Sequence, residues 1–485
     1  MRRMPKNNKG CVSEKKFFDE DTSSGIGMIK PVSYETNNSE DLGPPISESE
    51  TNTKIIDMNI GQLYRLLDGS NYNYQRFTLK RFFGNTNFSS IQEEVCNYRN
   101  NVLQFVQNDF FKNKGYSLVS ELPSSRNSGS VPKKSSIQCD IDKHFIAYAD
   151  ALVFYQNKKS DKIAIFFSFD SYSGQTYYEL FSSDNPDVIW EEWQEYAKKN
   201  NFYKNKKIDA NCGFLNIDEK ISWDDIILPN KFVDIIKSNV LNIFSMRDLL
   251  QKNNISMKRG IVFSSSPGTG KTMLCKVLAK EVDATVIYVL PSHIKQLFDI
   301  SRICDMAREL SPSLIIIEDI DFLTQDRETG NNWSVVELMN QMDGIEDFKD
   351  IVTLATTNMI ADVEKAIKNR PGRFDRVIDI PLPDLETRER MFNRFCLNFN
   401  IGDDVDFKSI SKETEKSTGA YIKEICITAA FIAIQNGSVD SNGKAIVSKK
   451  CFDESLKEIK DKDFSRFGEV ANIKKPVGFL GSNLD

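Results

Sequence analysis

The segment Ser264–Thr272 restricts what this chain can fold into more than any other part of the sequence. It reads Ser-Ser-Ser-Pro-Gly-Thr-Gly-Lys-Thr, and it stands between an apolar run, Gly260–Phe263, and a run of helical character, Met273–Ala279. Glycines at a strand-to-helix junction let successive backbone N–H groups face one point, and the positive end of the helix adds to that anion site. The pattern therefore predicts a phosphate-binding loop within an α/β sheet.

Two side chains of this loop carry the expected chemistry. Lys271 would reach the β and γ phosphates of a nucleotide, and Thr272 would offer its hydroxyl to Mg²⁺. Ser265 stands where the motif has its first glycine, and positive φ costs a serine roughly 1 kcal/mol more than a glycine, so we expect a slightly altered loop. The expected nucleotide contacts are Ser266, Pro267, Gly268, Thr269, Gly270, Lys271, Thr272 and Met273.

Polar residues follow two further apolar runs downstream. Leu314–Ile317 ends in Glu318 and Asp319, and Ile351–Thr357 ends in Asn358. Carboxylates at the carboxyl end of a buried parallel strand face the crevice where open α/β sheets bind ligands. We expect one carboxylate to hold the Mg²⁺ hydration shell, the next to polarise an attacking water, and Asn358 to bond the γ-phosphate or that water.

In this order, these elements resemble the AAA family of ATPases over about residues 220 to 460, and Arg370 and Arg373 around a Pro-Gly turn complete the likeness. The resemblance implies ATP and Mg²⁺ as cofactors. It makes Lys271 and Thr272 the Walker A pair and Asn358 sensor 1. The remaining roles that it implies are the Walker B pair at Glu318 and Asp319, the arginine fingers at Arg370 and Arg373, the adenine contacts at Asp225 and Ile226, and the sensor 2 turn at Gly419–Tyr421.

Two features depart from the usual pattern of the family. Its acidic pair is usually Asp then Glu, whereas this chain has Glu318 then Asp319, an order that is similar to the AAA translocase of a folded protein in the mitochondrial inner membrane. We expect Glu318 to reach the metal through a water ligand and Asp319 to act as general base. The segment Leu290–Ala307 is shorter than the pore loop of most protein-threading relatives, and Phe298 there is interpreted as a packed helix residue.

Composition narrows the function classes. The chain has 485 residues, a formal net charge of -6 and nine cysteines. The acidic balance argues against a nucleic-acid surface, and scattered cysteines in odd number suit reduced thiols in the cytoplasm. No apolar run is long enough to span a bilayer, so the translocase's membrane anchor is not expected. With His144 and His293 as the only histidines, a zinc protease site is excluded.

We expect an α/β architecture in which a parallel sheet is covered on both faces and followed by an all-helical lid. Strands are expected near residues 261, 285, 314, 352 and 377. In the preceding α+β region, the spacing of Ile91, Val95, Tyr98, Val102, Val106 and Phe110 predicts a helix, and 149–155 and 163–169 predict two strands. The expected division is a disordered tail 1–55, an N-terminal domain 56–200 for client recognition, a linker 201–222, an ATPase subdomain 223–383, a helical lid 384–465 and a C-terminal tail 466–485.

The function that we expect is ATP hydrolysis by a homo-oligomeric ring, a hexamer by resemblance, that remodels or disassembles protein clients. Two alternatives stay open at this point. One is a translocase that moves folded proteins without threading them, and the other is a slow ATP-dependent switch or scaffold. Turnover far below the ~1 to 10³ s⁻¹ of most enzymes would favour the switch.

Overall fold

The computed structural model describes residues 71–84, 86–123, 131–171, 173–294, 297–324, 333–343, 350–358, 374 and 376–459. The expected tails, 1–55 and 466–485, lie outside the described residues. The chain divides into two compact units. The first takes in the described residues up to Asn216 together with Ala284–Ile287 and Phe298–Ser313, and the second holds the remainder.

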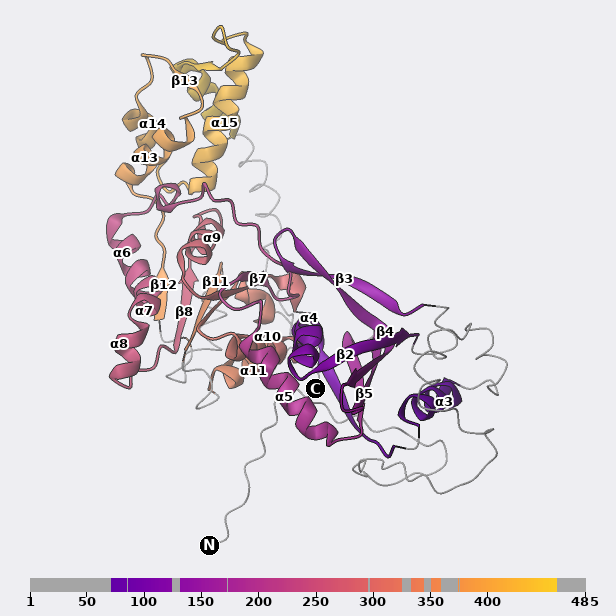
Figure 1. The fold of residues 1–485 in the computed structure, drawn as a ribbon. Helices are drawn as coiled ribbons and strands as arrows, with labels where there is room; N and C mark the ends of the chain where they lie inside the picture. Colours follow the sequence, from indigo (N-terminus) through magenta and orange to yellow (C-terminus); the bar gives the residue numbers. More distant parts are fainter. Residues whose placement is uncertain are drawn as a thin grey trace, which may run out of the picture. The chain divides into compact units, whose positions relative to one another are not determined.

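The N-terminal region is built on an antiparallel sheet of six strands in the order β1-β6-β5-β4-β2, with β3 paired to β4. Figure 1 labels β2, β3, β4 and β5 of this sheet. Its strands are β1 (Ser89–Cys96), β2 (Tyr116–Leu122), β3 (Lys133–Asp140), β4 (Lys143–Asn157), β5 (Lys162–Asp170) and β6 (Gln175–Ser182), and its helices are α3 (Asn71–Phe83), α4 (Asn97–Asn113) and α5 (Pro186–Lys199). The two strands expected at 149–155 and 163–169 are confirmed as parts of β4 and β5.

Both faces of the sheet are covered along the second half of β4, because alternate residues there pack against different helices. Leu152 and Phe154 join Phe82 of α3 in one apolar cluster. On the other face, Tyr155 stacks on Phe111 of α4, with ring centroids 4.5 Å apart. Trp190 and Trp193 of α5 are 3% and 0% exposed, so these tryptophans belong to the core.

The prediction of one helix from Ile91 to Phe110 is wrong for the first part of this segment. Ile91 and Val95 lie in β1, paired with β6, and α4 begins only at Asn97. A spacing of four residues returns to the same side of a strand as well as of a helix, so this pair could not distinguish the two structures. The helical part of the pattern, from Tyr98 to Phe110, is confirmed.

The second sheet has six strands in the order β12-β8-β11-β10-β9-β7. The strands are β7 (Lys207–Asp209), β8 (Arg259–Ser264), β9 (Thr285–Val289), β10 (Ser313–Ile317), β11 (Ile351–Thr357) and β12 (Arg376–Asp379). β8 pairs in parallel with β11 and β12, and all five expected strands are confirmed. β7 lies in the segment expected as a linker. The helices of this part are α6 (Asn230–Asn239), α7 (Leu241–Ser245), α8 (Arg247–Lys252), α9 (Lys271–Glu281), α10 (Leu297–Glu309) and α11 (Trp333–Asp343).

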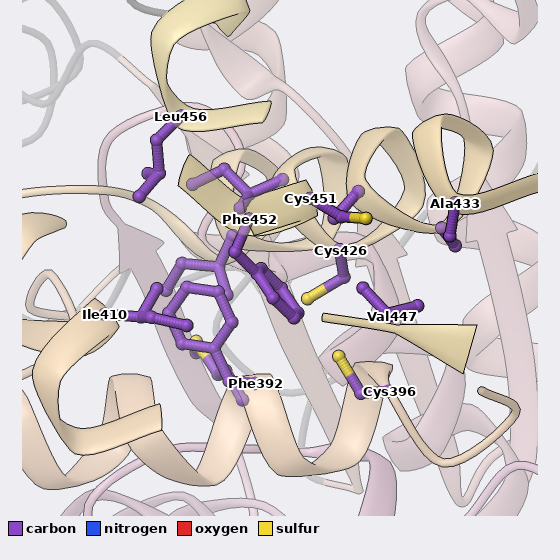
Figure 2. Packing of buried hydrophobic residues seen from close by; sticks show 14 of the residues in the cluster. Phe392, Cys396, Ile410, Cys426, Ala433, Val447, Cys451, Phe452 and Leu456 are labelled. Carbon is purple, nitrogen blue, oxygen red and sulfur yellow. The ribbon is translucent and has the colours of Figure 1, made fainter. Parts of the chain in front are cut away.

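The lid gathers α13 (Leu385–Phe395), α14 (Phe407–Glu413) and α15 (Gly419–Gln435) around one apolar core, which Figure 2 shows. Phe392, Cys426 and Phe452 are fully buried there. The lid is helical apart from a short parallel ladder of β13 (Asn400–Ile401) and β14 (Ile446–Val447). α15 ends at Gln435, with Asn436 as its C-cap residue, and Gly437 follows with φ of 71°. None of the described helices combines the length and apolar character that crossing a bilayer requires.

Candidate functional site

The phosphate-binding loop connects β8 to α9. Gly268 and Gly270 have φ of 79° and 99°, a region that glycine adopts without steric cost. Gly270 is the N-cap residue of α9, and as a glycine it offers this helix no side-chain cap. The N–H groups of the first turn of α9 therefore receive no acceptor from the N-cap side chain, and their partial positive charge favours an anion.

Lys271 is the centre of this loop. Its side chain is 7% exposed, and Nζ donates to the carbonyl of Ser265 at 3.0 Å and to Oδ1 of Asn358 at 2.7 Å. Burial lowers the pKa of the ammonium, and the carboxylates of Asp319 and Asp321 act in the opposite direction. A buried ammonium in this position needs anions around it, and phosphates would supply them.

Ser265 does not distort the loop, contrary to the expectation from its sequence position. Its φ is not positive, so the predicted cost of about 1 kcal/mol does not arise. Instead, its Oγ accepts a hydrogen bond from Lys271 Nζ at 2.9 Å and forms another with the hydroxyl of Thr269. The serine therefore adds a polar contact to Lys271 that a glycine would lack.

Glu318 follows β10 directly, and each of its carboxylate oxygens is met by a hydroxyl. Thr272 Oγ1 donates to Oε2 at 3.3 Å, and the phenol of Tyr288 on β9 donates to Oε1. Burial, and then the negative charges around it, raises the pKa of Tyr288, so the phenol stays protonated and acts as the donor. Glu318 itself is 9% exposed.

Asp319 contacts other residues than Glu318 does. Its φ of 48° lies in the left-handed region, which aspartate tolerates better than most residues, and its N–H donates to Thr356 Oγ1 at 2.9 Å. Its Oδ1 accepts from Nδ2 of Asn358 at 3.1 Å. Asn358 thus joins Lys271 to Asp319, as its amide accepts from one and donates to the other.

The segment expected at the adenine is tied to the lid. Asp225 closes a capping box with Ser222 and accepts a hydrogen bond from Arg394 of α13, which lowers the pKa of this carboxyl. The N–H groups of Asp225 and Ile226 donate to the carbonyls of Ser222 and Trp223. An adenine would therefore have to meet other groups of this segment, such as its carbonyls.

The sensor 2 turn, at the start of α15, contacts the phosphate-binding loop. Ala420 N donates to the carbonyl of Gly268 at 2.9 Å. A Cβ placed on Gly268 would lie 2.9 Å from Cβ of Ala420 and 3.0 Å from Oγ1 of Thr418. The loop and the lid therefore fit closely only because residue 268 has no side chain.

This contact leads to a prediction on stability. Gly268→Ala should lower the melting temperature more than Gly270→Ala, measured by thermal unfolding monitored by circular dichroism. Both alanines meet positive φ, at a cost of about 1–2 kcal/mol, but only the one at 268 also meets the lid turn, since nothing lies within 4 Å of the Cβ position at 270. Equal melting temperatures would contradict the close fit.

Some expected site residues lie outside the described part of the chain. Arg370 and Arg373 are among them, and so is the side chain of Phe298. Sequence reasoning missed the role of Tyr288. A signal was available, because a tyrosine within the apolar run Thr285–Val289 has a hydroxyl that needs a partner once the strand is buried.

The residues present fit a nucleoside triphosphate with Mg²⁺. Gly268 and Gly270 place no side chain at two positions of the loop, the N-cap residue of α9 offers no side-chain cap, and Lys271 holds a buried positive charge beside them. Thr272 and Glu318 provide a hydroxyl and a carboxylate within 3.3 Å of each other, which are oxygen ligands of the kind that Mg²⁺ prefers.

Comparison with known proteins agrees with this geometry. Residues 261–382 match the model of the ATPase family associated with various cellular activities, AAA. The chain therefore carries an AAA domain. This domain includes the phosphate-binding loop, both acidic residues and Asn358, so the resemblance recognised in the sequence is confirmed for the part that holds the site.

The relatives of the AAA domain include proteasome-activating nucleotidases of archaea. The one from Methanopyrus kandleri is 33% identical over 244 residues, which are 47% of this chain and 55% of the relative. The one from Saccharolobus solfataricus is 31% identical over 236 residues, 44% of this chain and 60% of the relative. The chain thus spans little more than half the length of the relatives that it matches.

Proposed function

We propose that this chain is an ATP hydrolase that works as a homo-oligomeric ring, a hexamer, and remodels or disassembles protein clients. The observation that carries the hydrolase proposal is the convergence on Asn358, which bonds the phosphate-binding Lys271 on one side and the acidic Asp319 on the other. A base and a phosphate ligand joined through one amide suit the activation of a water against a terminal phosphate.

The proposed roles follow from these contacts. Lys271 and the N–H groups at the start of α9 bind and orient the phosphates. Thr272 and, through a water ligand, Glu318 hold Mg²⁺, which would neutralise phosphate charge when bound. Asp319 accepts the proton of the attacking water at a carboxylate oxygen, and Asn358 orients that water or the phosphate. The family resemblance adds Arg370 and Arg373, which lie outside the described residues, as arginine fingers that stabilise the charge developing in the transition state.

The direct test is release of inorganic phosphate from ATP by the full chain, with Mg²⁺ and with the metal chelated. We expect turnover of about 1 s⁻¹ or faster that requires Mg²⁺. Binding of ATP with turnover far below this value would favour the slow switch or scaffold instead. No binding of ATP would contradict the proposal as a whole.

The ring and the protein client rest on the resemblance to the AAA family. The archaeal relatives are proteasome-activating nucleotidases by name, and a related remodelling role suits this chain. We propose 223–383 as the ATPase subdomain, 384–465 as the lid, and the N-terminal domain 56–200, linked through 201–222, as the part that selects the client. Because the thiols of Cys275, Cys396 and Cys426 are buried and not in disulfides, we place the protein in the cytoplasm.

The ring makes a prediction about Arg373. If this guanidinium reaches the γ-phosphate held by the next subunit, Arg373→Ala should bind ATP normally but turn over ~10³-fold more slowly or worse. Mixed with Asp319→Asn and allowed to exchange subunits, it should regain phosphate release. In such a ring an Arg373→Ala subunit keeps its base and receives an intact finger from its neighbour.

The control for this experiment is the double variant Arg373→Ala/Asp319→Asn mixed with each single variant. In either mixture every subunit lacks the finger or every subunit lacks the base, so no interface combines the two and no activity should be recovered. Native mass spectrometry would report whether mixed rings form. Mixed rings without recovered activity at any ratio would refute a finger supplied by the neighbouring subunit.

The translocation of folded proteins remains a second candidate. It is favoured by the Glu318-Asp319 order and by the short segment between Leu290 and the start of α10 at Leu297. A fluorescent client protein with a tight fold distinguishes the two modes. Threading would abolish its fluorescence in the presence of ATP, whereas transport or disassembly of the folded client would preserve it.

A further inference from the structure

Tyr288 has a contact in the candidate site that the proposed mechanism does not yet use. This tyrosine lies in β9, which is the neighbour of β10 in the sheet. Its hydroxyl donates to Oε1 of Glu318. The other oxygen of Glu318, Oε2, accepts from Thr272 at 3.3 Å. Tyr288 and Glu318 are 8% and 9% exposed, so solvent has little access to either group.

The geometry explains what the phenol contributes. A glutamate side chain has three rotatable bonds, and a single donor at Oε2 would leave the rest of the carboxylate free to turn. A buried carboxylate oxygen also needs a donor, because its desolvation is otherwise uncompensated. The phenol satisfies both requirements, since it occupies Oε1 and leaves Oε2 directed at the hydroxyl of Thr272.

We propose that Tyr288 is a positioning residue for the metal site: its hydroxyl fixes the Glu318 carboxylate so that Oε2 stays beside Thr272, ready for the hydration shell of Mg²⁺. This inference rests on the proposed function of the same site. It also gives a reason why glutamate is acceptable at this place, because its longer side chain spans the distance between the phenol and Thr272. Groups that orient a metal-binding residue commonly change metal affinity or activity by about 10- to 100-fold when removed.

The test measures binding of the β,γ-imido analogue of ATP by calorimetry, with Mg²⁺ and with the metal chelated, so that it does not depend on turnover. Tyr288→Phe should bind the metal-free analogue as the wild type does. The factor by which Mg²⁺ increases the affinity for the analogue should be at least about 10-fold smaller than in the wild type. In the hydrolysis assay, the same variant should need a higher Mg²⁺ concentration for half-maximal turnover.

A matched control is Tyr178→Phe. Tyr178 of β6 is also buried and its hydroxyl donates to Oδ1 of Asn100 on α4, so this change removes a buried phenol oxygen that has no contact with Glu318. It should leave the Mg²⁺ dependence of binding at the wild-type value. Loss of that dependence in both variants would mean that a general loss of stability is responsible, and would overturn the assignment.

A second variant keeps the inference testable if Tyr288→Phe does not fold. Glu318→Asp retains the charge, but its shorter side chain cannot accept hydrogen bonds from Tyr288 and Thr272 at the same time. The gain in analogue affinity that Mg²⁺ produces, the Mg²⁺ effect, should therefore fall by a similar factor. Adding Tyr288→Phe to Glu318→Asp should then change little. The inference is overturned if a folded Tyr288→Phe, or Glu318→Asp, keeps the full Mg²⁺ effect. Failure of the wild type to bind the analogue would instead count against the proposed function.

Discussion

Lys271→Ala should remove ATP binding, with a loss in affinity of at least about 100-fold. Hydrogen bonds to charged groups contribute roughly 1.5–3 kcal/mol each, and this ammonium is expected to make more than one with the phosphates. Lys271 is the only lysine or arginine between Ser264 and Thr272, so no other side chain of the loop can supply the charge. Calorimetry with ATP measures the effect.

The control for this prediction lies on the same helix. Lys276 is exposed and is five residues further along α9, so Lys276→Ala removes one positive charge without touching the loop. It should bind ATP within about twofold of wild type. Unchanged affinity in Lys271→Ala would disprove the assignment of the phosphate-binding loop, whereas an equal loss in both variants would indicate a long-range effect of charge.

The parts of the site that could be predicted from sequence are those in which a short motif determines a local structure. Lys271 follows a strand and a glycine-containing turn, and these three features together predict the backbone geometry of a phosphate-binding loop. Glu318 and Asp319 follow a short apolar run, rich in isoleucine, whose length and composition favour a buried strand. For these residues, local chemistry and the overall fold specify the same structure, which is the condition under which sequence reasoning works.

Other features depended on partners that are distant in the sequence. Ser265 was expected to strain the loop, but its backbone escapes positive φ and its hydroxyl contacts Lys271 and Thr269. Tyr288 became a site residue only because β9 and β10 are neighbours in the sheet. Ile91 and Val95 suggested a helix because a spacing of four is common to both kinds of secondary structure. In each case the missing information was which element packs alongside.

The Glu318-Asp319 order reverses the usual acidic pair of the family, and the contacts of the two residues indicate which one acts as the base. Thr272 and Tyr288 together occupy both oxygens of Glu318, which leaves it poorly placed to take a proton from water. Asp319 has one oxygen bonded to Asn358, and the structure gives no partner to its second oxygen among the described residues. This asymmetry supports the aspartate as the base and the glutamate as the metal-side group.

Asp319→Asn should consequently bind ATP with unchanged affinity and lose at least about 100-fold in turnover, because general base catalysis typically contributes 10²–10⁴-fold. The asparagine can still accept a hydrogen bond from Asn358 through its Oδ1, so the site keeps its shape. Its amide cannot accept the proton of the attacking water. Calorimetry for binding and phosphate release for turnover separate these two effects.

Two further variants complete this experiment. Asp379→Asn changes an exposed aspartate on β12 in the same way and should turn over like the wild type. Glu318→Gln should weaken the dependence on Mg²⁺, since it alters the metal-side carboxylate. The two roles are assigned the wrong way round if Glu318→Gln binds ATP and Mg²⁺ normally without turnover while Asp319→Asn hydrolyses at the wild-type rate. The longer residue would then be the base despite its two hydroxyl partners, and Tyr288 would have to release it during the reaction.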